Sequence, residues 1–182
     1  MLTAVGSKKN IMELPFYSCI SDIYESDEVQ KLGEITHHLY TTRLQHSLNV
    51  SYYNYIVCNF LGFDAVSAAR AGMVHDLFYY DRKERAKHKV HGEKSHCAYH
   101  PEVAAENASE SFDISTLERD IIIKHMWPVT FALPKYKESY LLTLVDKYCA
   151  LNESYQEIYN RFCQKKIFRY AYVFLCLMFI RL

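Results

Sequence analysis

Six histidine and aspartate residues are the strongest candidates for chemistry in this sequence, because they recur at intervals of at most 29 residues. They are His46, His75, Asp76, His100, His125 and Asp146. His75 and Asp76 are adjacent within the apolar run 73–79. Burying an unpaired carboxylate is costly, so such a pair inside a helix needs a partner, and a divalent metal ion is one.

Any one of these histidines is more simply explained as a core residue that is hydrogen-bonded to a backbone carbonyl. The four histidines and two aspartates together, placed on five predicted helices, are explained more economically by metal coordination. Imidazole and carboxylate ligands suit Mn, Fe, Zn, Ni or Co, and the absence of cysteine from the set argues against a structural zinc site. We therefore predict a divalent transition metal centre whose chemistry is hydrolytic or oxidative.

The elements that position these residues are predicted to be helices. Apolar spacing predicts helices over 27–40, 43–61, 64–80, 101–108, 117–126 and 140–151, with a helical continuation over 153–162 after a break. Gly62 is expected to end the second helix, and Pro101 places His100 at the start of the fourth. Because no convincing strand alternation occurs, the predicted fold is all-α, a compact helical bundle.

The remaining segments complete a single predicted domain over 26–182, with the metal-site core at about 36–150 and C-terminal helices over 151–182. Residues 1–25 are expected to form an irregular N-terminal arm, and the polar segment 81–99 is expected to be either a functional loop or a disordered one. The charge-free stretch 170–180 is too short to cross a bilayer as a helix. We interpret it as a core-docked or dimer-forming helix, which is compatible with a homo-oligomer, and a membrane-surface anchor is the alternative.

The balance of charges, the cysteine spacing and the N-terminal residues indicate the class of protein and its compartment. The 182 residues contain 21 basic and 21 acidic side chains, so no nucleic-acid partner is expected. The six cysteines show no CxxC spacing, which favours reduced thiols, and no apolar signal-peptide region follows Lys8 and Lys9. These observations together predict a cytoplasmic protein without a transmembrane segment.

The ordered set of ligands resembles the HD-domain superfamily of metal-dependent phosphohydrolases, over roughly residues 36–150. The resemblance implies that one metal is held by four residues: His46, His75, Asp76 and Asp146. It further implies a second ion, bound by His100 and His125 and bridged to the first by Asp76. In such enzymes a hydroxide between the metals attacks phosphorus, which makes His75 and Asp76 the expected catalytic residues.

Candidates for substrate binding lie close to the ligands in the sequence. Arg43 precedes His46 by nearly one helical turn and is a plausible phosphate clamp, while Lys135 and Lys137 are weaker candidates. His96 is four residues before His100 and can share its helix face, so either can be the ligand. We favour His100 because of Pro101, which leaves His96 as a substrate group or an ordinary loop histidine.

The substrate is expected to be a nucleotide or another small phosphorylated metabolite. Cleavage of cyclic dinucleotides is not supported, because no Gly-Tyr-Pro motif follows the His-Asp pair. Two alternatives remain open. One is a di-iron HD-type oxygenase with the same ligand order, and the other is a non-catalytic nucleotide-binding or sensor module.

Overall fold

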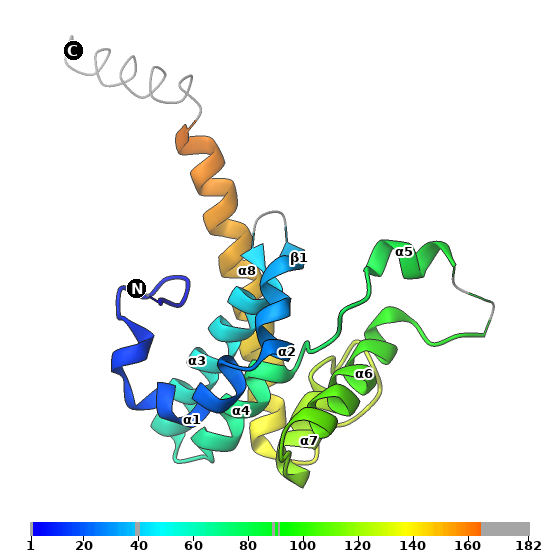
Figure 1. The fold of residues 1–182 in the computed structure, drawn as a ribbon, viewed down its shortest axis with the longest axis horizontal. Coiled ribbons are helices and arrows are strands. Elements are labelled where there is room, and N and C mark those ends of the chain that lie inside the picture. Colours follow the sequence, from blue (N-terminus) through cyan, green and yellow to red (C-terminus); the bar gives the residue numbers. More distant parts are fainter. Residues whose placement is uncertain (1, 39–40, 89, 91, 165–182) are drawn as a thin grey trace, which may run out of the picture.

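A computed structural model describes residues 2–38, 41–88, 90 and 92–164, and regular structure in this part of the chain is almost entirely helical (Figure 1). The α-helices are α1 (Pro15–Tyr24), α2 (Asp27–Gln30), α3 (Arg43–Leu61), α4 (Ala65–Val74), α5 (Arg82–Lys87), α6 (His96–Ser111), α7 (Thr116–Lys124) and α8 (Lys137–Gln164). They are joined by two 3-10 helices, η1 (Ile11–Glu13) and η2 (Lys31–Glu34), and by one antiparallel hairpin, β1 (Thr36–His38) with β2 (Thr41–Thr42). The predicted all-α fold is confirmed.

The close pairing of α3 with α4 places the start of one helix beside the end of the other. Gly72 of α4 permits this approach, because a Cβ at that position would lie 2.8 Å from Cα of Ser51. The Ser51 hydroxyl also donates a 2.7 Å hydrogen bond to the carbonyl of Ala69. The antiparallel arrangement brings His75, which follows α4, next to His46 near the start of α3, with ring centroids 5.5 Å apart.

Specific capping residues set the boundaries of α3, α4 and α7. Thr42 accepts a hydrogen bond from the third residue of α3, and Gly62 ends that helix with a φ of +68°. Asp64 caps α4 by accepting from the backbone of Ser67. Ser115 and Glu118 form a capping box at the start of α7.

The prediction of an irregular N-terminal arm is wrong. Residues 15–24 form α1, which packs against α4 and buries Phe16, Ile20 and Ile23 in the core. Pro15 occupies the first helical turn, where its missing N–H costs nothing. The N-terminal residues are therefore part of the domain. The predicted helix over 27–40 is also wrong, because it breaks after α2 into η2 and the short strand β1.

The region between the His75-Asp76 pair and His100 also differs from the prediction. α4 ends at Val74, and the segment expected to be a polar loop contains α5 and the first turn of α6. Ser95 caps α6 by accepting from the backbone of Ala98, so Pro101 lies inside this helix and does not begin it. His96 and His100 consequently share one helix face.

Helix α8 is continuous from Lys137 to Gln164, without the break expected before residue 153. It lies at the margin of the bundle, and Figure 1 shows its C-terminal part extending beyond the other helices. The interpretation of the apolar stretch 170–180 lies outside the described residues. Among the described helices, none is both long and apolar enough to span a membrane.

Candidate metal centre

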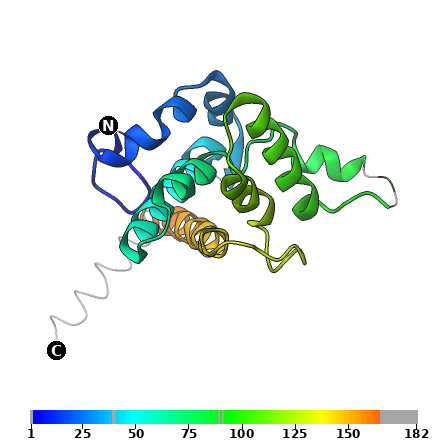
Figure 2. The same ribbon diagram turned by 90° about the horizontal axis from the view of Figure 1, so that it is seen from below.

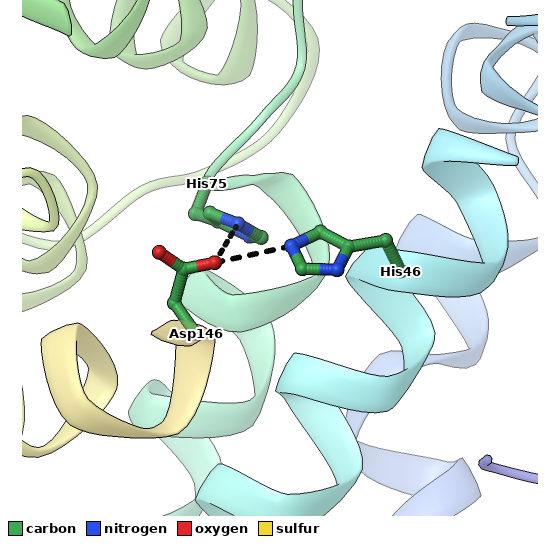
Figure 3. Close-up of side chains that lie close together, drawn as sticks. All are labelled: His46, His75 and Asp146. Carbon is green, nitrogen blue, oxygen red and sulfur yellow. Dashed lines mark hydrogen bonds and ion pairs between the residues drawn. The ribbon is translucent and has the colours of Figure 1, made fainter. Parts of the chain in front are cut away.

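Three helices contribute the first ligand group, which consists of His46, His75 and Asp146 (Figure 3). Nε2 of His46 lies 3.1 Å from Oδ1 of Asp146, and Nε2 of His75 lies 3.8 Å from the same oxygen. Both histidines are buried, whereas Asp146 is partly exposed. One potential ligand atom from each residue lies within 4.8 Å of the others, which places all three within reach of a single metal ion.

The other nitrogen of His46 faces a second carboxylate. Nδ1 lies 3.1 Å from each oxygen of the buried Glu153, and Glu153 also accepts a 2.7 Å hydrogen bond from the Asn49 amide. Burial lowers the pKa of His46, but the hydrogen bonds to Asp146 and Glu153 outweigh it and raise the pKa to about 10. His46 is therefore protonated at neutral pH without metal, and a metal ion binding at Nε2 must displace that proton.

Asp146 responds to the same contacts in the opposite direction. Burial raises the pKa of this carboxyl group, yet the hydrogen bond from His46 and the nearby His75 hold it well below the usual value. The first ligand group thus contains a carboxylate that remains ionised at all physiological pH values. A carboxylate in this state attracts a cation, either the imidazolium proton or a metal ion.

The second ligand group consists of Asp76, His100 and His125. Oδ1 of Asp76 lies 3.3 Å from Nε2 of His100 and 3.8 Å from Nε2 of His125, and the two Nε2 atoms are 2.9 Å apart. All three residues are buried. Burial is the largest cause that lowers the pKa of both histidines, to about 3 for His125.

Backbone hydrogen bonds determine which ring nitrogen of each histidine is protonated. Nδ1 of His75 lies 2.8 Å from the carbonyl oxygen of Gly72. Nδ1 of His100 lies 2.8 Å from the carbonyl oxygen of His96, and Nδ1 of His125 lies 2.7 Å from that of Ile122. Because a carbonyl oxygen only accepts, each Nδ1 must carry the hydrogen. In the neutral rings Nε2 therefore presents a lone pair, which is the form that binds a metal.

This tautomer assignment makes the 2.9 Å separation in the second group chemically informative. Two neutral imidazoles whose Nε2 lone pairs face each other cannot form a hydrogen bond, and they need a cation between them. A proton is a poor candidate because the pKa values of both His100 and His125 are lowered. A metal ion bound at ordinary metal–nitrogen distances of about 2.0–2.1 Å can bind both nitrogens at this separation.

In the first group, His75 also has a ring nitrogen that fits a metal ligand. Its Nε2 is buried and has no hydrogen-bond partner among the described residues. The 3.8 Å distance to Oδ1 of Asp146 is too long for a hydrogen bond. Buried polar atoms normally have partners, so this nitrogen fits a metal ligand better than an ordinary core histidine.

The two ligand groups adjoin each other, since the rings of His75 and His125 have centroids 5.1 Å apart. The structure therefore brings together all six residues that the sequence singled out. It divides them three and three, with Asp76 placed beside His100 and His125. The four-ligand first site implied by the family resemblance, with Asp76 as a member, is not the grouping that the geometry gives.

Two of the predicted substrate residues lie near the second group. Arg43 is buried, donates a hydrogen bond to the carbonyl of Phe78 and stacks on the Phe78 ring, with its guanidinium carbon 3.7 Å from the centroid. Burial lowers its pKa, although the nearby Asp76 opposes that shift. His96 stacks on His100 with ring centroids 4.6 Å apart, and burial and the charge of His100 lower the pKa of His96 to about 4. His96 is therefore a neutral neighbour of the ligands.

The other two predicted substrate residues are not brought to the centre. Nζ of Lys137 lies 4.1 Å from the centroid of Phe63, which follows the far end of α3. At 1.5 Å per residue, the 17 residues from His46 to Phe63 correspond to about 25 Å along a helix. Lys135 lies two residues before Lys137, and its backbone N–H is bound to Asp120. The prediction that these lysines bind the substrate is therefore not supported by their positions.

Sequence reasoning missed Glu153, which holds His46 from its outer side, and Asn49, which holds Glu153 in turn. Asn49 is tied to the N-terminal segment, because its side-chain oxygen accepts a 3.0 Å hydrogen bond from the backbone of Val5. A signal was available, since Glu153 follows Asp146 by seven residues, or about two helical turns, and so lies on the same helix face. The break expected before residue 153 hid this relation.

Comparison of the chain with protein-family models, with curated proteins and with solved structures finds no match. The functional assignment therefore depends on the geometry of the two ligand groups.

Proposed function

We propose that this protein is a metal-dependent phosphohydrolase of the HD-domain type, which cleaves a phosphomonoester or phosphodiester of a nucleotide or another small metabolite. The observation that carries the proposal is the pair of adjoining ligand groups, each made of two histidines and one aspartate. Their order along the chain supports the family resemblance. The absence of cysteine from both groups supports a catalytic centre over a structural zinc site.

The residues of the chain have separable roles in this proposal. His46, His75 and Asp146 would hold one divalent ion, and Asp76, His100 and His125 the other. Bound metal would lower the pKa of a water molecule and stabilise negative charge on the phosphoryl oxygens. The carbonyl groups that accept from Nδ1 of the histidines keep each Nε2 directed at the centre, so the ligands are oriented before an ion arrives.

Substrate binding is assigned to the side of the second ligand group. Arg43 is the candidate for the phosphate, since its buried Nε has no hydrogen-bond partner among the described residues. His96 and Tyr80, whose hydroxyl lies 3.1 Å from Nδ1 of His96, form the adjoining wall. The scattered cysteines favour a reducing compartment, so we place the enzyme in the cytoplasm.

Turnover of phosphoesters with different metals tests this function. Metal-free protein should be loaded separately with Mn, Co, Ni, Zn or Fe and assayed for phosphate release from a panel of nucleotides and generic phosphoesters. We expect turnover with at least one redox-inert ion and loss of that turnover in His75→Ala. Oxygen consumption with iron alone, without any phosphate release, would contradict the proposal and favour the di-iron oxygenase.

A further inference from the structure

The outward face of α8 is apolar along most of its length. The exposed residues that the structure describes on this helix between 140 and 159, a set that leaves out Glu157, are all aromatic or aliphatic. Leu151 is 72% exposed and Tyr155 is 66% exposed, and both values are high for large apolar side chains. Solvent-facing helix surfaces are ordinarily charged or polar, so this face requires an explanation.

The inward face of the same helix combines apolar core residues, Leu142, Val145 and Cys149, with polar ones. It carries Asp146 and Glu153 toward His46, and it also buries Glu138 and Thr143. Helix α8 therefore carries apolar residues on its outward face as well as its inward face, unlike an ordinary amphipathic helix. The metal ligands account for the inward polarity, but they do not account for the outward apolar surface.

The spacing of the exposed residues is that of a helix-pairing seam. They alternate at intervals of four and three residues, at Leu144, Tyr148, Leu151, Tyr155 and Ile158. A repeat of 3.5 residues is the pattern by which two helices pack side by side with interlocking side chains. We call these five residues the α8 stripe.

The α8 stripe continues into a shallow groove against α3. This apolar groove has a volume of about 370 Å³ and is lined by Tyr53, Val57, Leu144, Val145 and Tyr148. Farther along α3, Phe60 is 86% exposed. No described element lies on the outer side of α8, which Figure 2 shows at the edge of the bundle.

The size of this surface matches what a stable interface needs. The exposed residues of the stripe are flanked by the exposed Tyr140 and Tyr159. At roughly 200 Å² for a fully exposed large side chain, these residues together present on the order of 800 Å², which is the area that one partner contributes to a standard protein interface. Leaving out Glu157, whose side chain the structure does not describe, the exposed side chains from 140 to 159 are all uncharged.

We infer that the α8 stripe pairs with the same stripe of a second copy of this chain, forming a homodimer through side-by-side α8 helices. Residues of the groove between α3 and α8 receive side chains from the partner. Leu151 is the middle member of the five, so it meets its counterpart whether the two helices run parallel or antiparallel. The metal ligands lie on the opposite face of α8 and remain with their own chain.

The mass of the full chain in solution tests this inference, measured by light scattering across a concentration series. We expect a dimer for the wild type and an increase of about a hundredfold or more in the dimer dissociation constant for Leu151→Asp, because a charge enters the centre of the interface. Leu133→Asp is the matched control, since Leu133 is 62% exposed in the loop before α8, and it should remain dimeric. A monomeric wild type would overturn the inference, and the stripe would then be covered within the chain or by another molecule. A dimer that Leu151→Asp leaves intact would overturn it as well.

Cross-linking gives a second readout that does not depend on a destabilising substitution. Leu151→Cys should form a disulfide-linked dimer under mild oxidation, whereas Leu133→Cys should not, with the parent chain run beside both to account for its own cysteines. Equal cross-linking of the two variants would contradict pairing at the stripe. The metal content of Leu151→Asp should equal that of the wild type, which separates failure of this inference from failure of the metal centre.

Discussion

The two ligand groups lie side by side, yet they stabilise positive charge in opposite ways. In the first group, Asp146 and Glu153 flank His46 and favour its protonated form when no metal is bound. In the second group, the Nε2 atoms of His100 and His125 face each other at 2.9 Å. The pKa values of both histidines are lowered, so these rings resist protonation. In the proposed centre, the first group would therefore exchange a proton for a metal ion, while the second would accept an ion into a site that protons do not fill.

This difference shows how two neighbouring sites made from the same residue types can differ in affinity for a metal ion. The first group is rich in carboxylate because Glu153 lies behind His46. The second group has a single carboxylate, Asp76, for its two histidines. Metal binding at the first group should therefore depend on pH at neutrality and above, whereas binding at the second should weaken only in acid.

The largest effect is expected from removal of the one carboxylate of the second group. Asp76→Ala should reduce phosphoesterase turnover by on the order of a thousandfold, since two facing histidines then lose the negative charge that helps them hold an ion. Metal content, measured by elemental analysis, should fall together with activity. Asp113→Ala, at an exposed aspartate, is the control and should match the wild type. Full metal content and activity in Asp76→Ala would refute its role as a ligand.

Removal of a histidine from the second group should leave the first group working. His125→Ala is expected to reduce bound metal from two equivalents to about one and turnover by about a hundredfold. Metal analysis and steady-state kinetics check the two effects. His88→Ala, at an exposed histidine, serves as the control. Retention of two equivalents would mean that His125 is an ordinary core histidine.

The outer carboxylate of the first group offers a smaller perturbation. Glu153→Gln keeps a hydrogen-bond acceptor for His46 but removes the charge, so metal affinity of the first group should fall by about 10–100-fold with the second group unchanged. Titration calorimetry on metal-free protein resolves the two sites. Glu106→Gln, at an exposed position on α6, should have no effect. Equal weakening of both sites would show that Glu153 acts on the whole fold.

The smallest effect concerns the stability of the metal-free chain. The pKa of His46 is raised to about 10, so its stabilisation is complete below about pH 6.5 and is lost as the pH rises toward 10. The pKa of His125 is lowered to about 3, so its contribution is complete above about pH 6.5 and is lost as the pH falls. His46→Gln should reduce the alkaline loss in melting temperature by a few °C, and His125→Gln the acidic loss. Thermal melts with a chelator at pH 5, 6.5 and 9 measure the acidic and the alkaline loss in melting temperature. Identical pH profiles for the two variants would contradict the predicted difference between His46 and His125.

The sequence predicted those parts of the centre that depend on residue type and local capping. All six candidate ligands could be singled out because histidine and aspartate are unusual on apolar helix faces. The boundaries of α3 and α7 were predicted well because Thr42, Gly62 and Ser115 have specific backbone roles. The N-terminal segment was missed because α1 is stabilised by packing on α4, which local pattern does not show.

The errors near the centre have similar causes. Pro101 suggested a helix start, but Ser95 provides a better cap one and a half turns earlier, and α6 tolerates the proline within. Lys135 and Lys137 are near a ligand in the sequence, but the loop after His125 carries them toward Phe63. Glu153 could not be assigned while α8 was expected to break before it. Proximity along the chain was therefore a weaker guide than position on a helix face.

The central claim is a centre with two adjoining metal ions, and the most direct test is the metal content of purified full-length protein after loading and removal of excess ion. We predict close to two equivalents of transition metal in the wild type and about one equivalent in both His46→Ala and His125→Ala. No bound metal in the wild type after loading would contradict the claim, and a single equivalent that is retained in both variants would contradict it as well.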